Sequence, residues 1–385
     1  MVTADARGTV AFIHLGAVAA NVKLFLDKLT PGTELMAVVK ADAYGHGAVP
    51  VAKTALAAGA TWLGVAAAEE GRALRSEGID APILILGASN SEQVRLAVQD
   101  HLDLTVFEPL AWNSICYWAS ALNETVRVHL KVDTGMGRLG VHPDSVVGEW
   151  SQKLSDPRVV FQGLMSHLAT SDLDSAYTAQ QLEIFLDVIE AVRQHQGSLP
   201  PTIHLANSAA ALRFPGTHFN LVRVGIGLYG AGPYPKAPRL APVMQITAPV
   251  TMVKRVPPHT AIGYGKTYET TSWSTVATLG IGYADGYRRA FSNRASVLLH
   301  GRRCLVAGRV SMDQTTLVVP DDVAVSVGDS VVLLGSDGDD QITADDWAQW
   351  ADTISYEIFT GISGRIPRRY IENVDKGKKS GPMEL

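Results

Sequence analysis

Short apolar runs, rich in β-branched residues, recur along the first part of the chain and alternate with polar or alanine-rich stretches. Several runs are almost continuously apolar, which is typical of parallel strands that are buried on both faces. The stretches between them, such as 67–78 and 91–98, carry the charge and alanine patterns of helices. The eight runs are 36–39, 62–66, 82–86, 102–107, 126–132, 159–167, 202–206 and 219–224.

Eight alternating β and α units predict an α/β fold, a parallel (β/α)8 TIM-like barrel, whose active site lies at the C-terminal ends of the strands. An earlier run, 10–15, predicts a further strand that leads into a helix. We therefore expect a barrel domain over residues 1–240, with a binding site at that end of the strands.

The pattern then changes to short strands separated by turn residues. A proline-dense segment, 233–242, predicts a linker, and we expect a C-terminal mostly-β domain over residues 241–385. Asp346 follows Thr343 by three positions and predicts the start of a helix that runs to about Ala351, while the charged tail from Lys376 is expected to fray. The expected strands are 245–253, 276–279, 296–299, 315–319 and 330–334.

Composition narrows the class of protein. The chain has 385 residues, of which 46% are apolar and 18% charged, values typical of a soluble globular enzyme with more than one core. A net charge of -5 offers no basic footprint for nucleic acid, and the longest apolar stretch, 54–68, is too short to span a membrane. We therefore expect neither of these partners.

The cysteines and the N-terminal residues indicate the cellular compartment of the protein. Two cysteines, Cys116 and Cys304, are too few for a disulfide framework and fit a reducing compartment. Residues 9–20 imitate a signal peptide, but Asp5 offsets the charge of Arg7. We expect a cytoplasmic protein.

Lys40 is the first candidate for chemistry. It ends the apolar part of residues 36–47, MAVVKADAYGHG, where a charged and unpaired lysine is costly. A lysine held neutral can attack a carbonyl and form a Schiff base, as lysines do with pyridoxal phosphate. The alternative is a lysine at the end of a strand whose amine reaches solvent.

Other candidates share the predicted catalytic face. Arg138 follows the fifth run, His167 ends the sixth, and Arg223 lies at the end of the eighth. Asn207 and Ser208 follow the seventh run. Structural residues have no reason to gather at one end of a barrel, so this distribution favours a catalytic role for Lys40.

Residues 225–230, GIGLYG, match the dinucleotide pattern G-x-G-x-x-G after a strand. That pattern requires a following helix and an acidic residue about 20 positions later, whereas residues 231–254 contain prolines and no Asp or Glu. The context excludes a nicotinamide site. Small residues here still allow backbone N–H groups to approach a phosphate, which barrels of this class commonly bind after strands seven and eight.

Eight segments in unbroken order resemble the alanine racemase family, whose members use pyridoxal 5'-phosphate and combine a barrel with a C-terminal β domain. The resemblance covers residues 10–370. The segments are VVKADAYGHG (38–47), HLKVDTGMGRLG (129–140), HLANSAA (204–210), VRVGIGLYG (222–230), IGYGKTY (262–268), IGYADGY (281–287), GRVSMDQ (308–314) and YEIFTGISGRIPR (356–368).

The resemblance implies two bases, because racemisation needs a proton carrier on each face of the substrate's α-carbon. Lys40 would hold the cofactor through a Schiff base and then move a proton, and Tyr264 would act from the partner subunit of a homodimer with shared active sites. Arg223 would face the pyridine nitrogen, and His167 would link Arg223 to Tyr264. An arginine disfavours a protonated ring and weakens the electron sink.

The remaining roles are also carried over from the family. Arg138 and the backbone of Met312 would hold the substrate carboxylate, since a guanidinium offers paired donors. Lys131, seven residues before Arg138, would be carbamylated. His14 and Ser171 depart from residues common in the family, although neither is assigned a role. Asp313 and Tyr283 would line the entrance, or else pack between domains, and the cofactor-binding set would comprise Lys40, Tyr44, His167, Asn207, Ser208, Arg223, Gly225, Ile226 and Tyr356.

The predicted function is that of an alanine racemase that supplies D-alanine for peptidoglycan, without a metal. A racemase of broader specificity, acting on serine, is the nearest alternative because pocket size depends on packing. A barrel-type decarboxylase would need an acidic partner for the ring nitrogen, where this chain has Arg223. A non-catalytic pyridoxal-phosphate binding protein would leave the β domain unexplained.

Overall fold

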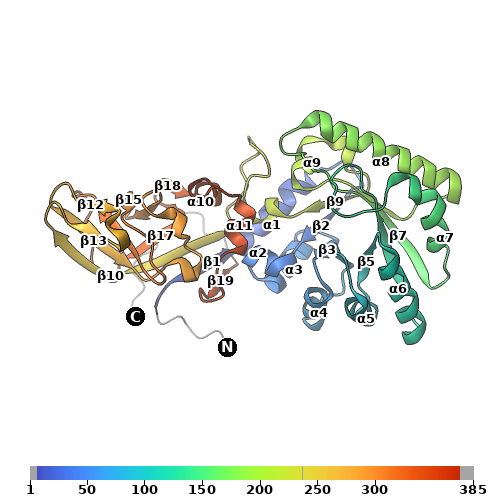
Figure 1. The fold of residues 1–385 in the computed structure, drawn as a ribbon, viewed down its shortest axis with the longest axis horizontal. Helices are drawn as coiled ribbons and strands as arrows, with labels where there is room; N and C mark the ends of the chain where they lie inside the picture. Colours follow the sequence, from blue (N-terminus) through green and yellow to red (C-terminus); the bar gives the residue numbers. More distant parts are fainter. Residues whose placement is uncertain (1–6, 236, 373–385) are drawn as a thin grey trace. The chain divides into compact units, whose positions relative to one another are not determined.

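The computed structural model describes residues 7–235 and 237–372, which form two compact units. One unit comprises Ala19–Leu240, and the other combines the described residues up to Val18 with those from Ala241 onward. Figure 1 shows the first unit as strands surrounded by helices and the second as a sheet with short helices beside it. No described helix is long and apolar enough to cross a membrane.

The first unit is an eight-stranded parallel barrel in which β9 pairs with β2. Each of the eight apolar runs forms one strand, so the predicted fold class is confirmed. The interior contains Met36, Trp62, Leu84, Met165 and Leu221. The strands are β2 (Glu34–Val38), β3 (Trp62–Val65), β4 (Ile83–Ile85), β5 (Asp103–Val106), β6 (Val126–Lys131), β7 (Val159–Met165), β8 (Thr202–His204) and β9 (Leu221–Val224).

Helices follow the strands and cover the outside of the barrel (Figure 1). Side chains cap the starts of several of them. The Asn90 side chain accepts from the Gln93 N–H before α5, and the Asp174 carboxylate accepts from two N–H groups of α8. The helices are α1 (Leu15–Leu26), α3 (Ala48–Ala57), α4 (Ala68–Ser76), α5 (Ser91–Gln99), α6 (Pro109–Leu122), α7 (Ser151–Leu154), α8 (Ser175–Gln196) and α9 (Ser208–Arg213).

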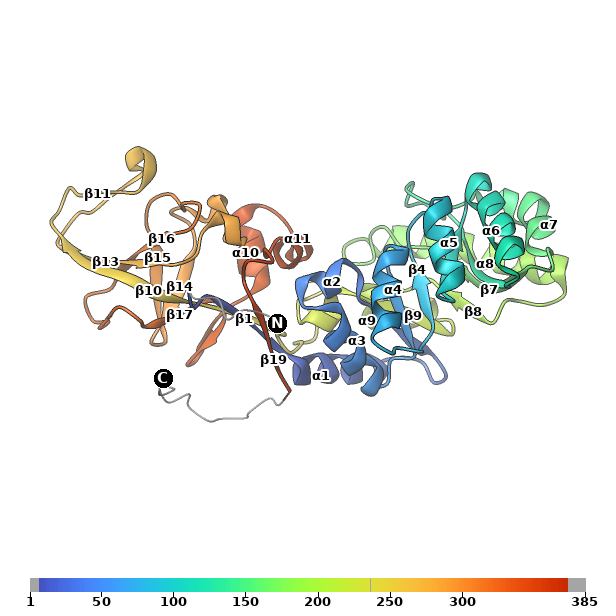
Figure 2. The same ribbon diagram turned by 90° about the horizontal axis from the view of Figure 1, so that it is seen from below.

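The second unit is a nine-stranded sheet in the order β18-β17-β14-β15-β16-β13-β10-β1-β19. A separate hairpin, β11 (Ala261–Ile262) and β12 (Tyr268–Glu269), extends away from the sheet in Figure 2. The sheet strands are β1 (Val10–His14), β10 (Met244–Val256), β13 (Ser274–Leu279), β14 (Ser296–Leu299), β15 (Arg302–Val306), β16 (Thr315–Val319), β17 (Ser330–Asp337), β18 (Asp340–Ile342) and β19 (Arg368–Ile371).

Strand β1 differs from the expected domain layout. It pairs antiparallel with β10 and parallel with β19, so the first strand of the chain lies in the second unit although the predicted barrel range was 1–240. These pairings span more than 200 residues of sequence, which local patterns do not report. The described chain then enters the barrel unit within α1.

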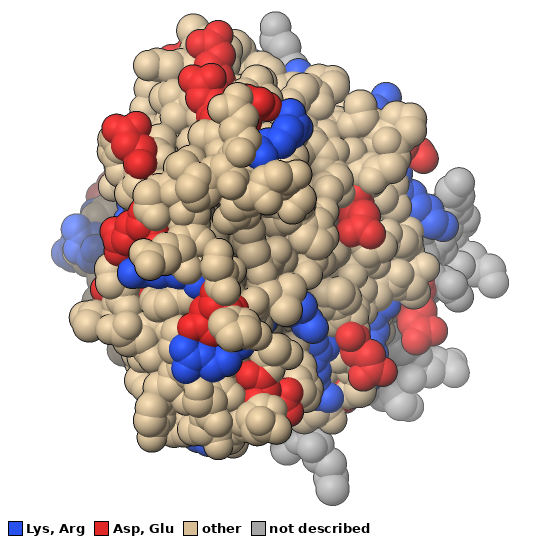
Figure 3. Space-filling model, turned by 90° about the vertical axis from the view of Figure 1, so that its right-hand side faces the viewer, with Lys and Arg blue, Asp and Glu red and all other residues tan. Residues whose placement is uncertain are grey.

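The predicted helix in the second unit is confirmed as α10 (Ala344–Ala351), followed by α11 (Ser355–Thr360). The Thr343 side chain accepts from the Asp346 N–H, and the Asp346 carboxylate accepts from the Thr343 N–H, which forms a capping box. The tail from Lys376 lies outside the described residues. On the face drawn in Figure 3, acidic and basic side chains are interspersed.

Candidate active site

Lys40 follows β2 after one residue, Val39, and begins an unusual turn, α2 (Lys40–Gly45). The next four residues, 41–44, have φ values between +51° and +54°, a left-handed conformation that costs a non-glycine residue about 1–2 kcal/mol. The Glu70 carboxylate supports the turn by accepting from the N–H groups of Ala41 and Ala66, both at 2.7 Å. Backbone strain of this kind is concentrated at functional sites.

The barrel end around Lys40 is rich in positive charge. Burial lowers the pKa of Lys40, the nearby charge of Arg138 lowers it further, and Glu70 opposes both effects. Burial lowers the pKa of Lys131 to about 8, with Arg223 and Arg138 contributing. Both amines are therefore more readily neutral than ordinary lysines, and the group of cations favours an anionic ligand.

Arg223, on β9, is almost completely buried and hydrogen-bonded. Its Nη1 donates to His204 Nδ1 at 2.8 Å and to the His204 carbonyl at 3.0 Å. Its Nη2 donates to the carbonyls of Ser166 and Leu205, at 2.7 and 3.0 Å, and lies 3.2 Å from His167 Nδ1. Burial lowers the pKa of Arg223 to about 10, so the guanidinium stays charged at neutral pH.

His167 follows β7 and accepts from Arg223 through Nδ1, which places its proton on Nε2. Burial lowers the pKa of His167 well below its usual value, and the charges of Arg223 and Lys131 add to the effect. The imidazole is therefore neutral. It can accept from the arginine on one side and donate to a further group on the other.

Neutral donors converge after β8 and β9. Ser208 Oγ accepts from the Gly225 N–H at 2.9 Å, which leaves the serine O–H free to donate outward. A Cβ on Gly225 would lie 2.6 Å from the Tyr44 hydroxyl, so only glycine allows this approach. Asn207 caps α9 by accepting from the Ala210 N–H at 3.0 Å and thereby positions Ser208. Ile226 begins the next short helix and is buried.

Arg138 lies exposed in the loop after β6. The Asp133 carboxylate orders this loop by accepting from three consecutive N–H groups at 2.9–3.1 Å: Gly135, Met136 and Gly137. Those hydrogen bonds lower the pKa of Asp133 against the opposing effect of burial, the largest single contribution. The barrel unit brings its predicted site residues together in two groups. Electrostatic interactions link Lys40, Lys131, Arg138, His167 and Arg223. Close approaches link Tyr44, Ser208 and Gly225, beside Asn207 and Ile226 in the sequence.

The other candidates lie in the second unit. Tyr264 is 71% exposed and lies in the loop between β11 and β12. Tyr283 and Met312 are also exposed, and their loops are joined by the hydrogen bond from the Tyr283 N–H to the Ser311 carbonyl. Asp313 accepts from Arg365 at 2.8 Å. Tyr356, on α11, is exposed to the same extent as Tyr283.

Sequence patterns missed Glu70 and two buried histidines, His129 and His204. Glu70 resembles an ordinary solvated residue of a helix's first turn, and its contact with the turn after Lys40 has no sequence signal. The histidines did carry a signal. Each lies inside an apolar run predicted to be a buried strand, where an imidazole needs a hydrogen-bonding partner.

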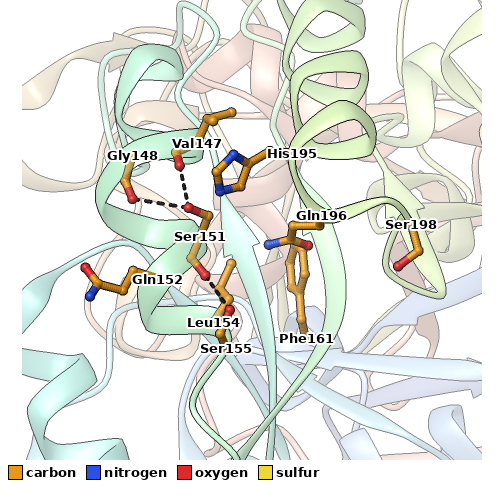
Figure 4. A pocket seen from close by; sticks show the side chains of 10 residues that line it. All are labelled: Val147, Gly148, Ser151, Gln152, Leu154, Ser155, Phe161, His195, Gln196 and Ser198. Atoms are coloured by element: carbon orange, nitrogen blue, oxygen red, sulfur yellow. Dashed lines mark hydrogen bonds between the residues drawn. The ribbon is translucent and has the colours of Figure 1, made fainter.

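A pocket of about 700 Å³ lies elsewhere on the barrel, between the α7 segment, β7 and the end of α8 (Figure 4). Its lining includes none of the candidate residues. The Ser151 hydroxyl is bonded to the carbonyls of Val147 and Gly148, and His195 and Gln196 face the same space. The segments that line it lead into the N-terminal ends of β7 and β8, whereas active sites in this fold lie at the C-terminal ends of the strands.

The barrel, the strand-end lysine and the cradle of neutral donors define an enzyme of the barrel-type pyridoxal-phosphate class. The chain matches the family profiles for the N-terminal domain of alanine racemase over residues 13–233 and for the C-terminal domain over residues 243–370. It belongs to the alanine racemase family. The family uses pyridoxal 5'-phosphate, and the chain is an isomerase of that class.

Individual relatives cover nearly the whole chain. The alanine racemase of Symbiobacterium thermophilum is 45% identical and covers 94% of this chain and 97% of its own length. The alanine racemase of Desulfovibrio desulfuricans is 42% identical, with 97% and 100% covered. Among solved structures, alanine racemase from the D-cycloserine producing Streptomyces lavendulae superposes with a TM-score of 0.90 at 39% identity, covering 95% and 97%. The enzyme from Bacillus anthracis with bound L-Ala-P has a TM-score of 0.89 at 37% identity, covering 95% and 96%.

Proposed function

We propose that this chain interconverts L- and D-alanine by moving a proton between the two faces of Cα, with Lys40 and Tyr264 as the two bases. The family assignment supports alanine as the substrate and does not favour the serine alternative. The observation that carries the proposal is Lys40 itself. Its amine has a lowered pKa and projects from a strained turn at the C-terminal end of a barrel strand.

The barrel residues fit the cofactor. Pyridoxal phosphate, when bound, withdraws electrons from Cα and makes its proton acidic. Lys40 would hold the aldehyde carbon covalently. The phosphate would be received by the hydroxyls of Tyr44 and Ser208 and by the N–H groups of Gly225 and Ile226, with Asn207 in support and Tyr356 completing the set. The Ser208 O–H is available for this because its oxygen already accepts from Gly225.

Arg223 would set the electronic character of the ring. Its Nη1 and Nη2 groups donate to protein acceptors, whereas among the described residues no acceptor is bonded to its Nε–H. That N–H would donate to the pyridine nitrogen. A guanidinium with a pKa of about 10 keeps its own proton at neutral pH, so the ring nitrogen would stay unprotonated and side reactions would be limited.

Arg138 and the backbone N–H of Met312 would bind the substrate carboxylate, while Asp313 and Tyr283 would line the entrance. Lys131 would be carbamylated and, as an anion, would orient Arg138. Its pKa of about 8 supports this reaction, because carbon dioxide combines with the neutral amine. Binding residues of this kind position the substrate for proton transfer and exclude water.

Tyr264 would serve the active site of the partner subunit in a homodimer. A tyrosine that is 71% exposed on an extended hairpin is available to another chain. His167, neutral and already accepting from Arg223, would connect Arg223 to this hydroxyl. We place the enzyme in the cytoplasm, where its product would supply peptidoglycan synthesis.

The two-base scheme is tested by deuterium exchange at Cα, started separately from each enantiomer. In Tyr264→Phe we expect exchange to slow by about 10²–10⁴-fold from the enantiomer whose proton the tyrosine removes, because a general base contributes that much. Tyr117→Phe, which changes an exposed tyrosine of α6, is the matched control and should exchange at the normal rate. Unchanged exchange from both enantiomers in Tyr264→Phe would contradict the scheme.

A further inference from the structure

A chain of buried hydrogen bonds crosses the interior of the barrel and ends at Arg223. It joins Asp103 on β5, His129 on β6 and His204 on β8 to Arg223 on β9. Asp103 Oδ2 lies 3.3 Å from His129 Nε2, and His129 Nδ1 lies 2.9 Å from His204 Nε2. His204 Nδ1 lies 2.8 Å from Arg223 Nη1. No member of the chain is more than 4% exposed.

The protons in this chain have one consistent arrangement. Arg223 can only donate, so His204 Nδ1 accepts and its proton lies on Nε2. His204 Nε2–H then donates to His129 Nδ1, and His129 Nε2–H donates to the Asp103 carboxylate. Both imidazoles are neutral in this arrangement, in keeping with the pKa of each histidine, which burial lowers.

The barrel makes room for the two rings. A Cβ on Gly163 of β7 would lie 2.1 Å from His129 Nδ1 and 2.6 Å from Thr202 Oγ1, so any larger residue would displace the imidazole. The ring of Trp62 packs edge-on against His129 at a centroid distance of 5.5 Å. Four buried polar side chains cost more than an apolar core would, which calls for a role beyond stability.

We propose that His204 is a positioning residue for Arg223, and that His129 and Asp103 hold His204 in the tautomer that accepts from the guanidinium. This inference rests on the proposed role of Arg223 toward the cofactor ring. With Nη1 and Nη2 held by the protein, Nε–H is the donor left for the ring nitrogen. The opposite tautomer would place two donors 2.8 Å apart and drive Arg223 out of this geometry.

The substitution Asp103→Asn should reverse the direction in which each hydrogen bond between Asp103 and Arg223 is donated. Asp103 Oδ1 accepts from Arg127 Nε at 2.7 Å, and arginine has no acceptor. The amide oxygen of the variant must therefore face Arg127, and its NH₂ must face His129 Nε2. His129 then carries its proton on Nδ1, and so does His204. The His204 Nδ1–H would then point at Arg223 Nη1, which is itself a donor.

The experiment measures histidine tautomers by ¹⁵N NMR of the ¹⁵N-histidine-labelled holoenzyme, together with steady-state kinetics. In the wild type we expect protonated Nε2 in His129 and His204; in Asp103→Asn the protons should move to Nδ1. The kcat should fall about 10- to 100-fold with KM within about threefold, the scale of residues that orient a ligand group. Asp100→Asn breaks an ion pair with Arg72 and is the matched control, with kcat within about twofold.

A double variant separates positioning from structural support. Removing the donor in Asp103→Asn/Arg127→Met lets the amide oxygen turn to His129, so the original tautomers and most of the kcat should return. A purely structural role predicts that the double variant is worse than the single one. Unchanged tautomers in Asp103→Asn, or a kcat within about twofold of wild type despite reversed tautomers, would overturn the proposal.

If Asp103→Asn does not fold, the wild-type spectrum still tests the proposal. A proton on Nδ1 of His204 in the wild type would overturn it directly. The tautomers are measured whether or not the protein racemises alanine. Failure of this inference is therefore distinguishable from failure of the proposed function, which would show as absent activity in the wild type.

Discussion

The two units present their candidate residues in opposite ways. In the barrel, Arg223 and Ser208 are buried and held by several hydrogen bonds, so their positions are set by the fold. In the second unit, Tyr264 and Met312 are more than half exposed. The difference indicates a division of labour. The barrel residues are held in place by the fold before any ligand binds, whereas those of the β unit are left exposed, as the proposed action on a partner subunit requires.

The largest expected effect of this difference is on stability. Arg223→Leu leaves His204 Nδ1 and the carbonyls of Ser166 and Leu205 without their donor, so we expect a loss of about 3–5 kcal/mol in the free energy of unfolding. Urea denaturation measures it. Tyr264→Phe is the counterpart in the β unit and should change stability by less than about 0.5 kcal/mol. Equal losses of unfolding free energy in Arg223→Leu and Tyr264→Phe would contradict the difference drawn between the two units.

The left-handed turn after Lys40 gives a smaller effect within the barrel. Glu70→Ala removes the acceptor of the N–H groups of Ala41 and Ala66, and hydrogen bonds to a charged group contribute about 1.5–3 kcal/mol. We expect a loss of that size and a lower kcat, because the turn orients Lys40. Glu69→Ala, at the neighbouring position of α4, is the control. Normal stability and kcat in Glu70→Ala would show that the turn does not depend on the Glu70 carboxylate.

The last effect concerns pH and appears only over a limited pH range. The pKa of Lys131 is lowered to about 8 in the folded state, so between about pH 8 and 10.5 the unfolded chain binds more protons at this position. Stability should therefore gain a contribution from Lys131 as pH rises through this range, by at most roughly 3 kcal/mol. Unfolding in CO₂-free buffers at several pH values measures it. The gain should be absent in Lys131→Met; an identical pH dependence in both proteins would contradict the assignment.

Much of the barrel could be predicted from the sequence because buried parallel strands are marked by short apolar runs. The C-terminal ends of such strands share one face, so Lys40, His167 and Arg223 could be expected there before any contact was known. The placement of β1 could not be predicted. Its partners β10 and β19 are hundreds of residues away, and pairing at that distance has no local pattern.

The missing parts of the site share a physical cause. Ala41 and Tyr44 are not residues that favour positive φ, so the left-handed turn is imposed by contacts such as that of Glu70. His129 and His204 meet across the barrel because of its strand stagger, which residue order along each strand does not contain. Sequence shows that a buried histidine needs a partner, but only the fold shows which one.

The central claim is that Lys40 carries the cofactor, and the absorbance spectrum of the purified, cofactor-saturated protein tests it most directly. We predict a visible band from the covalent link to Lys40. Lys40→Ala should lose this band, whereas Lys53→Ala, which changes a surface lysine of α3, should keep it. A band that persists in Lys40→Ala, or the absence of a band in the saturated wild type, would contradict the account.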